Sequence, residues 1–332
     1  MVLIFSVEND LSTTQVIKWL KFNKCKFIRI NDNDIIEILY IKLDGDFEFE
    51  IEIKTYNSMV RVNSKNIEFV WYRRGVFSTR SSLIKTDKIK LRSEINSINN
   101  YILAENYSAW KTIEDYMYSN IPHLNKPRDT IANKITMLRI AQNNGFVIPK
   151  SIVSTTQSNI KEFVNDNNSI TKPISQGWID RKESDISIDL LTEKLELEIT
   201  NDLEANVNAT LVQELVDKRY ELRVFHLMGC NFASCIFSQN DDQTKVDFRN
   251  YNFKRNNRVV PYTLGKSIEI KINKFMLDMN INCGSLDIII NTDGEAIFLE
   301  VNPVGQFSQV SKPCNYNLEL LIAKEILKYV KN

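Results

Sequence analysis

Apolar residues near the N-terminus of the chain follow two different periods. A continuous apolar run at 2–7 predicts a buried strand, and the stretch after it carries apolar residues at helical spacing. Asp10 or Ser12 can cap that helix, because a short polar side chain accepts hydrogen bonds from the first backbone N–H groups. A second apolar run at 27–30 completes a strand–helix–strand unit, which predicts a parallel sheet.

The next part of the chain alternates between apolar and polar residues. Strands at 38–43 and 47–53 flank an Asp-Gly-Asp turn and predict a hairpin. A further strand is expected at 67–75, and a helical pattern covers 87–119. Because prolines interrupt the pattern directly afterwards, we place the first domain boundary after residue 122.

A helix is predicted over 129–146, with Asp129 or Thr130 as its cap and Gly145 at its end. Beyond it, strands and helices alternate to the C-terminus. The expected strands are 151–154, 169–174, 221–228, 230–238, 245–249, 285–291 and 296–302, and the expected helices are 157–165, 265–280 and 316–331. This alternation predicts an α/β (α+β) fold.

Composition excludes several classes of protein. The 42 basic and 42 acidic side chains cancel, so we predict no nucleic-acid partner and no membrane partner. With nine glycines, the chain contains neither GxxxxGK[ST] nor GxGxxG, which excludes an ordinary P-loop or dinucleotide fold. The five cysteines form no CxxC pair and the N-terminus has no signal-peptide pattern, so we expect reduced thiols and a cytoplasmic location.

The most informative motif is a predicted hairpin near the C-terminus. Asp287 lies on its first strand, and Glu300 and Asn302 lie two residues apart on its second strand. Residues two apart share a face of a strand, so these three side chains can point the same way. Their oxygen atoms suit Mg²⁺ that bridges phosphates, although solvated polar positions on an ordinary hairpin remain the alternative.

Two lysines are candidates for binding phosphate. Lys172 ends an apolar strand and precedes a loop with Gly177, where backbone N–H groups can approach an anion. Lys134 lies on the predicted helix at 129–146. The alternative for each lysine is a solvated surface position.

The segment 211–227 contains the remaining candidates. Gln213, Glu214 and Val216 form a pattern typical of a hinge that contacts an adenine edge. Glu221 and Arg223 share one face of the next strand, and the planar guanidinium can bind a carboxylate or phosphate with two hydrogen bonds. A simple cross-strand ion pair is the alternative.

In this order, the candidates resemble the ATP-grasp ligase superfamily from about residue 125 to the C-terminus. The resemblance implies an N-terminal pre-ATP-grasp βαβ domain, a central lid domain and a C-terminal ATP-grasp domain. We expect these domains at 1–122, 123–210 and 211–332.

Three further motifs resemble one group within the superfamily. EVNPVGQF at 300–307, VDFRNYN at 246–252 and WYRRG at 71–75 are similar to graspetide maturases of the microviridin and grasp-with-spasm types. The resemblance implies an enzyme that uses ATP and one or two Mg²⁺ ions. It would phosphorylate Glu or Asp side chains of a ribosomal precursor peptide and couple them to Ser/Thr hydroxyls or Lys amines, giving ω-esters or ω-amides. A homodimer is compatible with it.

The resemblance also implies roles for individual residues. Those implied for nucleotide binding are Lys134, Lys172, Gln213, Glu214, Val216 and Glu221. Those implied for Mg²⁺ are Asp287, Glu300 and Asn302. Those implied for catalysis are Arg223, Arg249 and Lys172, and those for peptide binding are Arg73, Arg74, Asp247, Arg249 and Arg255.

Charge is separated along the chain in a way that fits a peptide substrate. The charged side chains of residues 183–204 are almost all acidic, whereas those of 245–274 are mostly basic and can receive the acidic core of a leader-bearing peptide. A solvated basic surface is equally compatible with this pattern. Two other functions stay open: an ATP-grasp ligase for a small substrate or a protein C-terminus, of the glutathione-synthetase or glutamate-ligase kind, and a non-catalytic peptide-binding protein.

Overall fold

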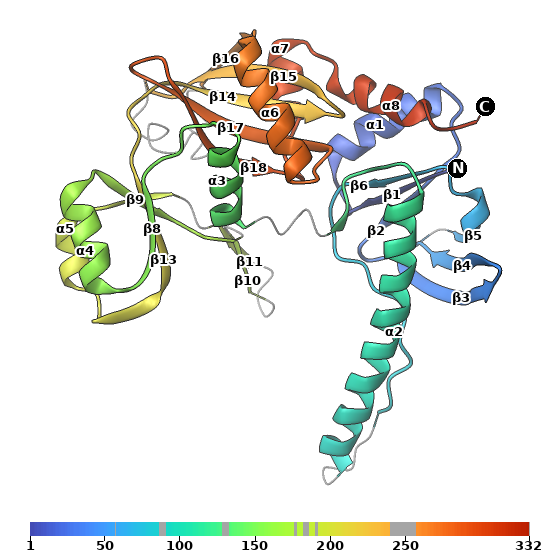
Figure 1. The fold of residues 1–332 in the computed structure, drawn as a ribbon. Coiled ribbons are helices and arrows are strands. Elements are labelled where there is room, and N and C mark those ends of the chain that lie inside the picture. The colour runs from blue at the N-terminus through green and yellow to red at the C-terminus, as the bar shows by residue number, and fades with distance from the viewer. Residues whose placement is uncertain are drawn as a thin grey trace. The chain divides into compact units, whose positions relative to one another are not determined.

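The computed structural model describes residues 1–56, 58–85, 91–127, 133–175, 178–181, 186–189, 192–239 and 257–331. It divides the chain into two compact units, of which the first comprises Met1–Pro127 and Leu318–Asn332 and the second Arg128–Asn317 (Figure 1). The C-terminal residues thus group with the N-terminal unit. The division into three domains stays a prediction.

A parallel sheet forms the centre of the first unit and confirms the predicted βαβ start. Its strand order is β2-β1-β6-β7, with β1 (Val2–Ser6), β2 (Phe27–Asn31), β6 (Phe69–Tyr72) and β7 (His123–Leu124). Helix α1 (Leu11–Phe22) connects β1 to β2. Asp10 caps this helix by accepting hydrogen bonds from the backbone N–H groups of Ser12 and Thr13.

A second, antiparallel sheet of the first unit contains the predicted hairpin. It consists of β3 (Ile35–Asp44), β4 (Asp46–Lys54) and β5 (Met59–Asn63), followed by the short helix η1 (Ser64–Asn66). Helix α2 (Arg92–Asn120) buries Trp110 and Ile113 against this sheet. Helix α8 (Leu318–Leu327) contacts α1. The predicted helix at 316–331 is therefore shorter than expected.

The second unit contains a four-stranded antiparallel sheet of order β12-β9-β13-β8. Its strands are β8 (Ser151–Thr156), β9 (Ser169–Lys172), β12 (Glu193–Leu195) and β13 (Asn206–Glu214). Helices α4 (Gln157–Asp166) and α5 (Leu197–Asn201) contact each other beside it, and β10 (Trp178–Arg181) pairs with β11 (Ile186–Asp189). Ile160, Val164 and Val212 form the buried core between α4 and β13.

A five-stranded antiparallel sheet completes the second unit, in the order β16-β15-β14-β17-β18. Its strands are β14 (Lys218–Leu227), β15 (Cys230–Phe237), β16 (Arg258–Tyr262), β17 (Cys283–Asn291) and β18 (Ala296–Asn302). Helices α3 (Lys134–Asn143) and α6 (Lys266–Asp278) pack on one face, and α7 (Ser308–Cys314) contacts β14, β15 and β16. The strand predicted at 245–249 lies outside the described residues, and β16 was not predicted.

Local side chains fix the ends of α3. Asn133 accepts hydrogen bonds from Ile135 N and Thr136 N, so it is the observed N-cap of the described helix. The proposed caps Asp129 and Thr130 lie outside the described residues. Gly145 ends the helix as predicted, with a φ of 78° that favours glycine. Across the described ranges, no helix combines the length and apolar character needed to cross a bilayer.

Candidate active site

The five-stranded sheet has one apolar face and one polar face. Leu222, Leu286 and Phe298 belong to the core that α3 and α6 cover. On each strand, the residues that alternate with these core positions lie on the opposite face. There, direct register partners form a polar row across four neighbouring strands: Ser234, Arg223, Asp287 and Glu300.

An ion pair between Arg223 and Asp287 lies at the centre of this row. Nη1 of Arg223 donates to both carboxylate oxygens of Asp287, at 2.7 and 2.6 Å. The side chains are only 7% and 9% exposed, so each charge depends on the other for neutralisation. The predicted cross-strand pairing of Arg223 thus exists, and its partner is the predicted metal ligand.

The predicted hairpin of β17 and β18 is present, and an extra residue in β18, Leu299, shifts its register between Asp287 and Ile288. Asp287 lies opposite Glu300, and Ser285 lies opposite Asn302. Lys134 reaches this group from α3, with its Nζ 3.7 Å from Oε2 of Glu300. It also donates to the carbonyl oxygen of Ser175 at 2.8 Å.

The donor set on this hairpin fits a hard divalent cation. Asp287, Glu300 and Asn302 offer carboxylate and amide oxygens, and the described residues contain no cluster of three His, Cys, Asp or Glu side chains. The hydroxyl of Ser285 is fully buried beside them and has no hydrogen-bond partner among the described residues.

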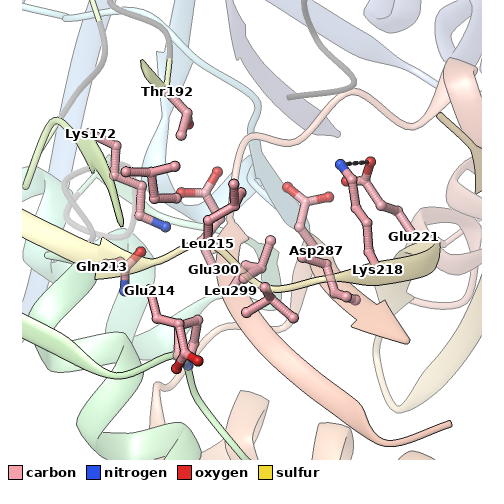
Figure 2. A pocket seen from close by; sticks show the side chains of 14 residues that line it. Lys172, Thr192, Gln213, Glu214, Leu215, Lys218, Glu221, Asp287, Leu299 and Glu300 are labelled. Atoms are coloured by element: carbon pink, nitrogen blue, oxygen red, sulfur yellow. Dashed lines mark hydrogen bonds and ion pairs between the residues drawn. The ribbon is translucent and has the colours of Figure 1, made fainter. Parts of the chain in front are cut away.

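A pocket that is partly open to solvent adjoins this group. It lies where β13 of the four-stranded sheet ends at Glu214 and β14 of the five-stranded sheet begins at Lys218. Figure 2 shows Lys172 on one side of the pocket and Asp287 with the Lys218–Glu221 pair on the other. The predicted site residues that line the pocket are Lys172, Gln213, Glu214, Val216, Glu221, Asp287 and Glu300.

Gln213 and Glu214 lie at the connection between the two sheets, where a hinge was predicted. Nε2 of Gln213 donates to the hydroxyl of Ser151 at 2.8 Å, and its Oε1 is buried without a partner among the described residues. The backbone N–H of Glu214 donates to the carbonyl oxygen of Lys150. Gln213 is 1% exposed, so leaving Oε1 without a hydrogen bond costs free energy, and a donor on a bound ligand would remove this cost.

Lys218 lines the pocket although sequence reasoning did not select it. Its Nζ donates to Oε1 of Glu221 at 2.7 Å. In a regular strand, residues three apart point to opposite faces, so the sequence pattern contained no signal for this contact. The register of β14 against β17 is irregular between Lys218 and Tyr220, and this irregularity changes the face.

Of the proposed peptide-binding residues, the structure describes only Arg73 and Arg74. Arg73 and Arg74 belong to the first unit, where each places Nε within 3.5 Å of Asp10 Oδ2. Arg73 is 3% exposed and contacts the residue that caps α1, so it stabilises the start of this helix. Asp247, Arg249 and Arg255 lie outside the described residues.

No protein-family model matches the chain, and no curated protein matches it. Among solved structures, a RiPP-associated ATP-grasp ligase from Chryseobacterium gregarium, in complex with ADP and a leader and core peptide, is similar over 100% of this chain and 97% of its own. The TM-score is 0.77 at 19% identity. The macrocyclase MdnC from Microcystis aeruginosa, bound with precursor peptide MdnA, is similar over 99% and 100% of the two chains, with a TM-score of 0.74 at 21% identity.

The chain has the ATP-grasp fold. A weaker similarity, to D-alanyl-alanine synthetase A from Vibrio cholerae, has a TM-score of 0.55 at 12% identity and covers 99% of this chain and 97% of that one. The fold class predicted from the ordered motifs is therefore confirmed.

Proposed function

We propose that this ATP-grasp protein is a ligase that uses ATP to activate side-chain carboxylates of a ribosomal precursor peptide. It then joins them to Ser/Thr hydroxyls or Lys amines, giving macrocyclic ω-esters or ω-amides. The observation that carries the proposal is the pocket at the junction of two sheets, which is lined by Lys172 and by the facing carboxylates of Asp287 and Glu300, with Asp287 paired to Arg223. Full-length similarity to peptide-bound ATP-grasp ligases supports the peptide substrate.

The chemistry explains why the site needs these groups. A carboxylate is a poor electrophile, so one of its oxygens first attacks the γ-phosphorus of ATP, and ADP leaves. The hydroxyl or amine then attacks the acyl carbon, and phosphate departs with the former carboxylate oxygen. Phosphoryl transfer asks a protein mainly for positioning and charge neutralisation. Mg²⁺, when bound, would neutralise phosphate charge beside the protein's own cations.

We assign the phosphates to Lys134 and Lys172 and the adenine to Gln213, Glu214 and Val216. Their places beside one pocket support this assignment. Glu221 would contact the ribose. The residues that would hold one or two Mg²⁺ ions are Asp287, Glu300 and Asn302.

Arg223 would bind the acceptor carboxylate and stabilise the acyl phosphate. Its guanidinium already holds a carboxylate with two contacts, and its Nε is buried with no hydrogen-bond partner among the described residues. A second acidic group could use that unused donor. Residues proposed to contact the peptide, on sequence grounds alone, are Arg73, Arg74, Asp247, Arg249 and Arg255.

The proposed partner is a precursor peptide with a leader and an acidic core. We also propose a cytoplasmic location, because ATP is supplied there and all five cysteines are free thiols in the structure. The proposal that the protein forms a homodimer rests only on the resemblance to graspetide maturases.

The experiment incubates the purified protein with ATP, Mg²⁺ and a short precursor peptide encoded beside it, followed by mass spectrometry. We expect the peptide to lose one water mass for each bond formed. Addition of free amino acids to a small or protein substrate would instead support the glutathione-synthetase or glutamate-ligase kind of activity. Full ATP-dependent activity in a variant with Asp287→Ala and Glu300→Ala would contradict the assignment of the metal ligands.

A further inference from the structure

A β-bulge at the start of β14 brings Lys218 to the polar face of the five-stranded sheet. Lys218 pairs with Asn291 and Tyr220 pairs with Ile290, so one extra residue, Arg219, is inserted in β14. Without that insertion, Lys218 and Glu221 would point to opposite faces, because they are three residues apart. Bulges commonly redirect side chains next to functional sites.

The bulge places the Lys218 ammonium against a buried carboxylate that lines the pocket. Nζ of Lys218 donates to Oε1 of Glu221 at 2.7 Å, and the two side chains are 6% and 7% exposed. The hydroxyl of Ser238, itself fully buried, donates to the same oxygen at 2.6 Å. Figure 2 shows the Lys218–Glu221 contact beside Asp287.

Both donors meet one oxygen of Glu221 and leave the other unused. Oε2 accepts no hydrogen bond from the described residues, whereas Oε1 accepts two. A carboxylate oxygen has capacity for two donors, and Oε2 is not among the fully buried unpaired atoms of the described residues, so a ligand can reach it. Since Glu221 lines the pocket, a ligand hydroxyl is the natural donor for Oε2.

The charge of Glu221 depends on Lys218. Burial raises the pKa of Glu221, and the nearby Asp287 carboxylate acts in the same direction. Lys218 and the Ser238 hydroxyl oppose this rise in pKa. Asp287 is itself paired with Arg223, so Lys218 is the cation that directly stabilises the ionised form of Glu221.

We propose that Lys218 is a positioning residue of the nucleotide site. Together with Ser238 it holds Oε1 of Glu221, so that Oε2 accepts a hydrogen bond from a ribose hydroxyl of the bound nucleotide. This inference rests on the proposed function, because it requires a nucleotide in the pocket. Lys218 acts through Glu221 and does not contact the reacting atoms.

The test compares the binding of ADP with that of an ADP analogue lacking both ribose hydroxyls, by isothermal titration calorimetry with Mg²⁺ present. A hydrogen bond to a charged acceptor predicts that the unaltered protein prefers ADP by about tenfold or more. Lys218→Met should reduce this preference to about twofold or less, because Oε2 is no longer held in place. Lys218→Arg should retain part of the preference.

Arg219→Met is the matched control. It removes one positive charge from the neighbouring residue, whose side chain is exposed, and leaves the Lys218–Glu221 contact in place. We expect it to keep the preference for ADP. A general electrostatic effect would instead weaken the binding of both ligands equally in both variants, and that result would overturn the inference.

Ser238→Ala provides an independent arm if Lys218→Met does not fold, as judged by its thermal unfolding. It removes the second donor to Oε1 and should lower the ADP preference by about threefold or more. An unchanged preference in the folded variants would refute the role of Lys218. If the unaltered protein binds ADP without any preference, the inference fails alone; if it binds neither ligand, the proposed function fails as well.

Discussion

Replacing Arg223 with methionine removes the cation that neutralises Asp287 in the centre of the five-stranded sheet. The two side chains are 7% and 9% exposed, and Nη1 lies 2.7 and 2.6 Å from the carboxylate oxygens. Removing one member leaves a charge in a site with little solvent. Losses on breaking such a pair are about 3–5 kcal/mol, so Arg223→Met should lower the free energy of unfolding by about this amount.

A second substitution separates structural from functional effects. Adding Asp287→Leu to Arg223→Met replaces the ion pair with apolar groups of similar size, which is often neutral or stabilising. We therefore expect the double variant to recover most of the lost stability, to within about 1–2 kcal/mol of the unaltered protein. It should remain inactive, because both groups are assigned to the reaction.

Urea unfolding followed by circular dichroism measures these free energies, and an unchanged m-value shows that the variants unfold from equally compact states. Lys328→Met is the control, since it removes an ion pair with Glu325 whose cation is 64% exposed, and it should change stability little. An Arg223→Met variant as stable as the unaltered protein would refute the reasoning. So would a double variant that is both stable and fully active.

Three other predictions follow from local contacts. Gly305→Ala should destabilise the protein by about 1–3 kcal/mol in thermal or urea unfolding, because a Cβ would lie 2.5 Å from Cβ of Ser285; an unchanged stability would contradict the close packing. Lys172→Met should raise the KM for ATP about tenfold or more in a steady-state assay, since a phosphate would lose its cation, and an unaltered KM would exclude Lys172 from that role. Asp10→Asn keeps a capping oxygen but loses the charge that pairs with Arg73. Burial raises the pKa of Asp10, but the arginines and hydrogen bonds around this carboxylate lower it overall. The unaltered protein should therefore be more stable than Asp10→Asn above the unfolded-state pKa near 3.8, and this advantage should disappear as the pH falls below that value. Unfolding curves across pH 2–7 measure the difference, and a difference that does not depend on pH would contradict the ion pair.

The hairpin of β17 and β18 shows what sequence patterns can predict. Its strands are apolar except at a few positions, and the two-residue period alone places Glu300 and Asn302 on one face. The structure confirms that Asp287 lies opposite Glu300. The burial of one face of the sheet against α3 and α6 explains why these charged side chains lie on the other face. The exact partner of Asp287 does not follow from the period, because the extra residue Leu299 shifts the register at this point.

Lys218 shows where such reasoning fails. Its contact with Glu221 depends on a bulge, and the local sequence shows no glycine or proline that would mark one. The extra residue is set by pairing between β14 and β17, which lie far apart in the sequence. Long-range pairing of this kind cannot be read from a local pattern.

Gly305 and Arg73 have structural roles that the sequence pattern did not predict. Gly305 is required for close packing, because a side chain would collide with Ser285 and with the carbonyl oxygen of Asn302. It has no positive φ, so the need for glycine comes from this packing and not from the backbone conformation. Arg73 contacts Asp10 at the start of α1, a partner that could not be inferred from residues distant in the sequence.

The most direct test of the proposed chemistry follows an oxygen atom. The precursor peptide is prepared with oxygen-18 in its Glu and Asp side-chain carboxylates and incubated with the protein, ATP and Mg²⁺. Activation through an acyl phosphate predicts ADP as the nucleotide product and one labelled oxygen in inorganic phosphate for each bond formed. Unlabelled phosphate, or AMP and pyrophosphate with the label in AMP, would contradict the account.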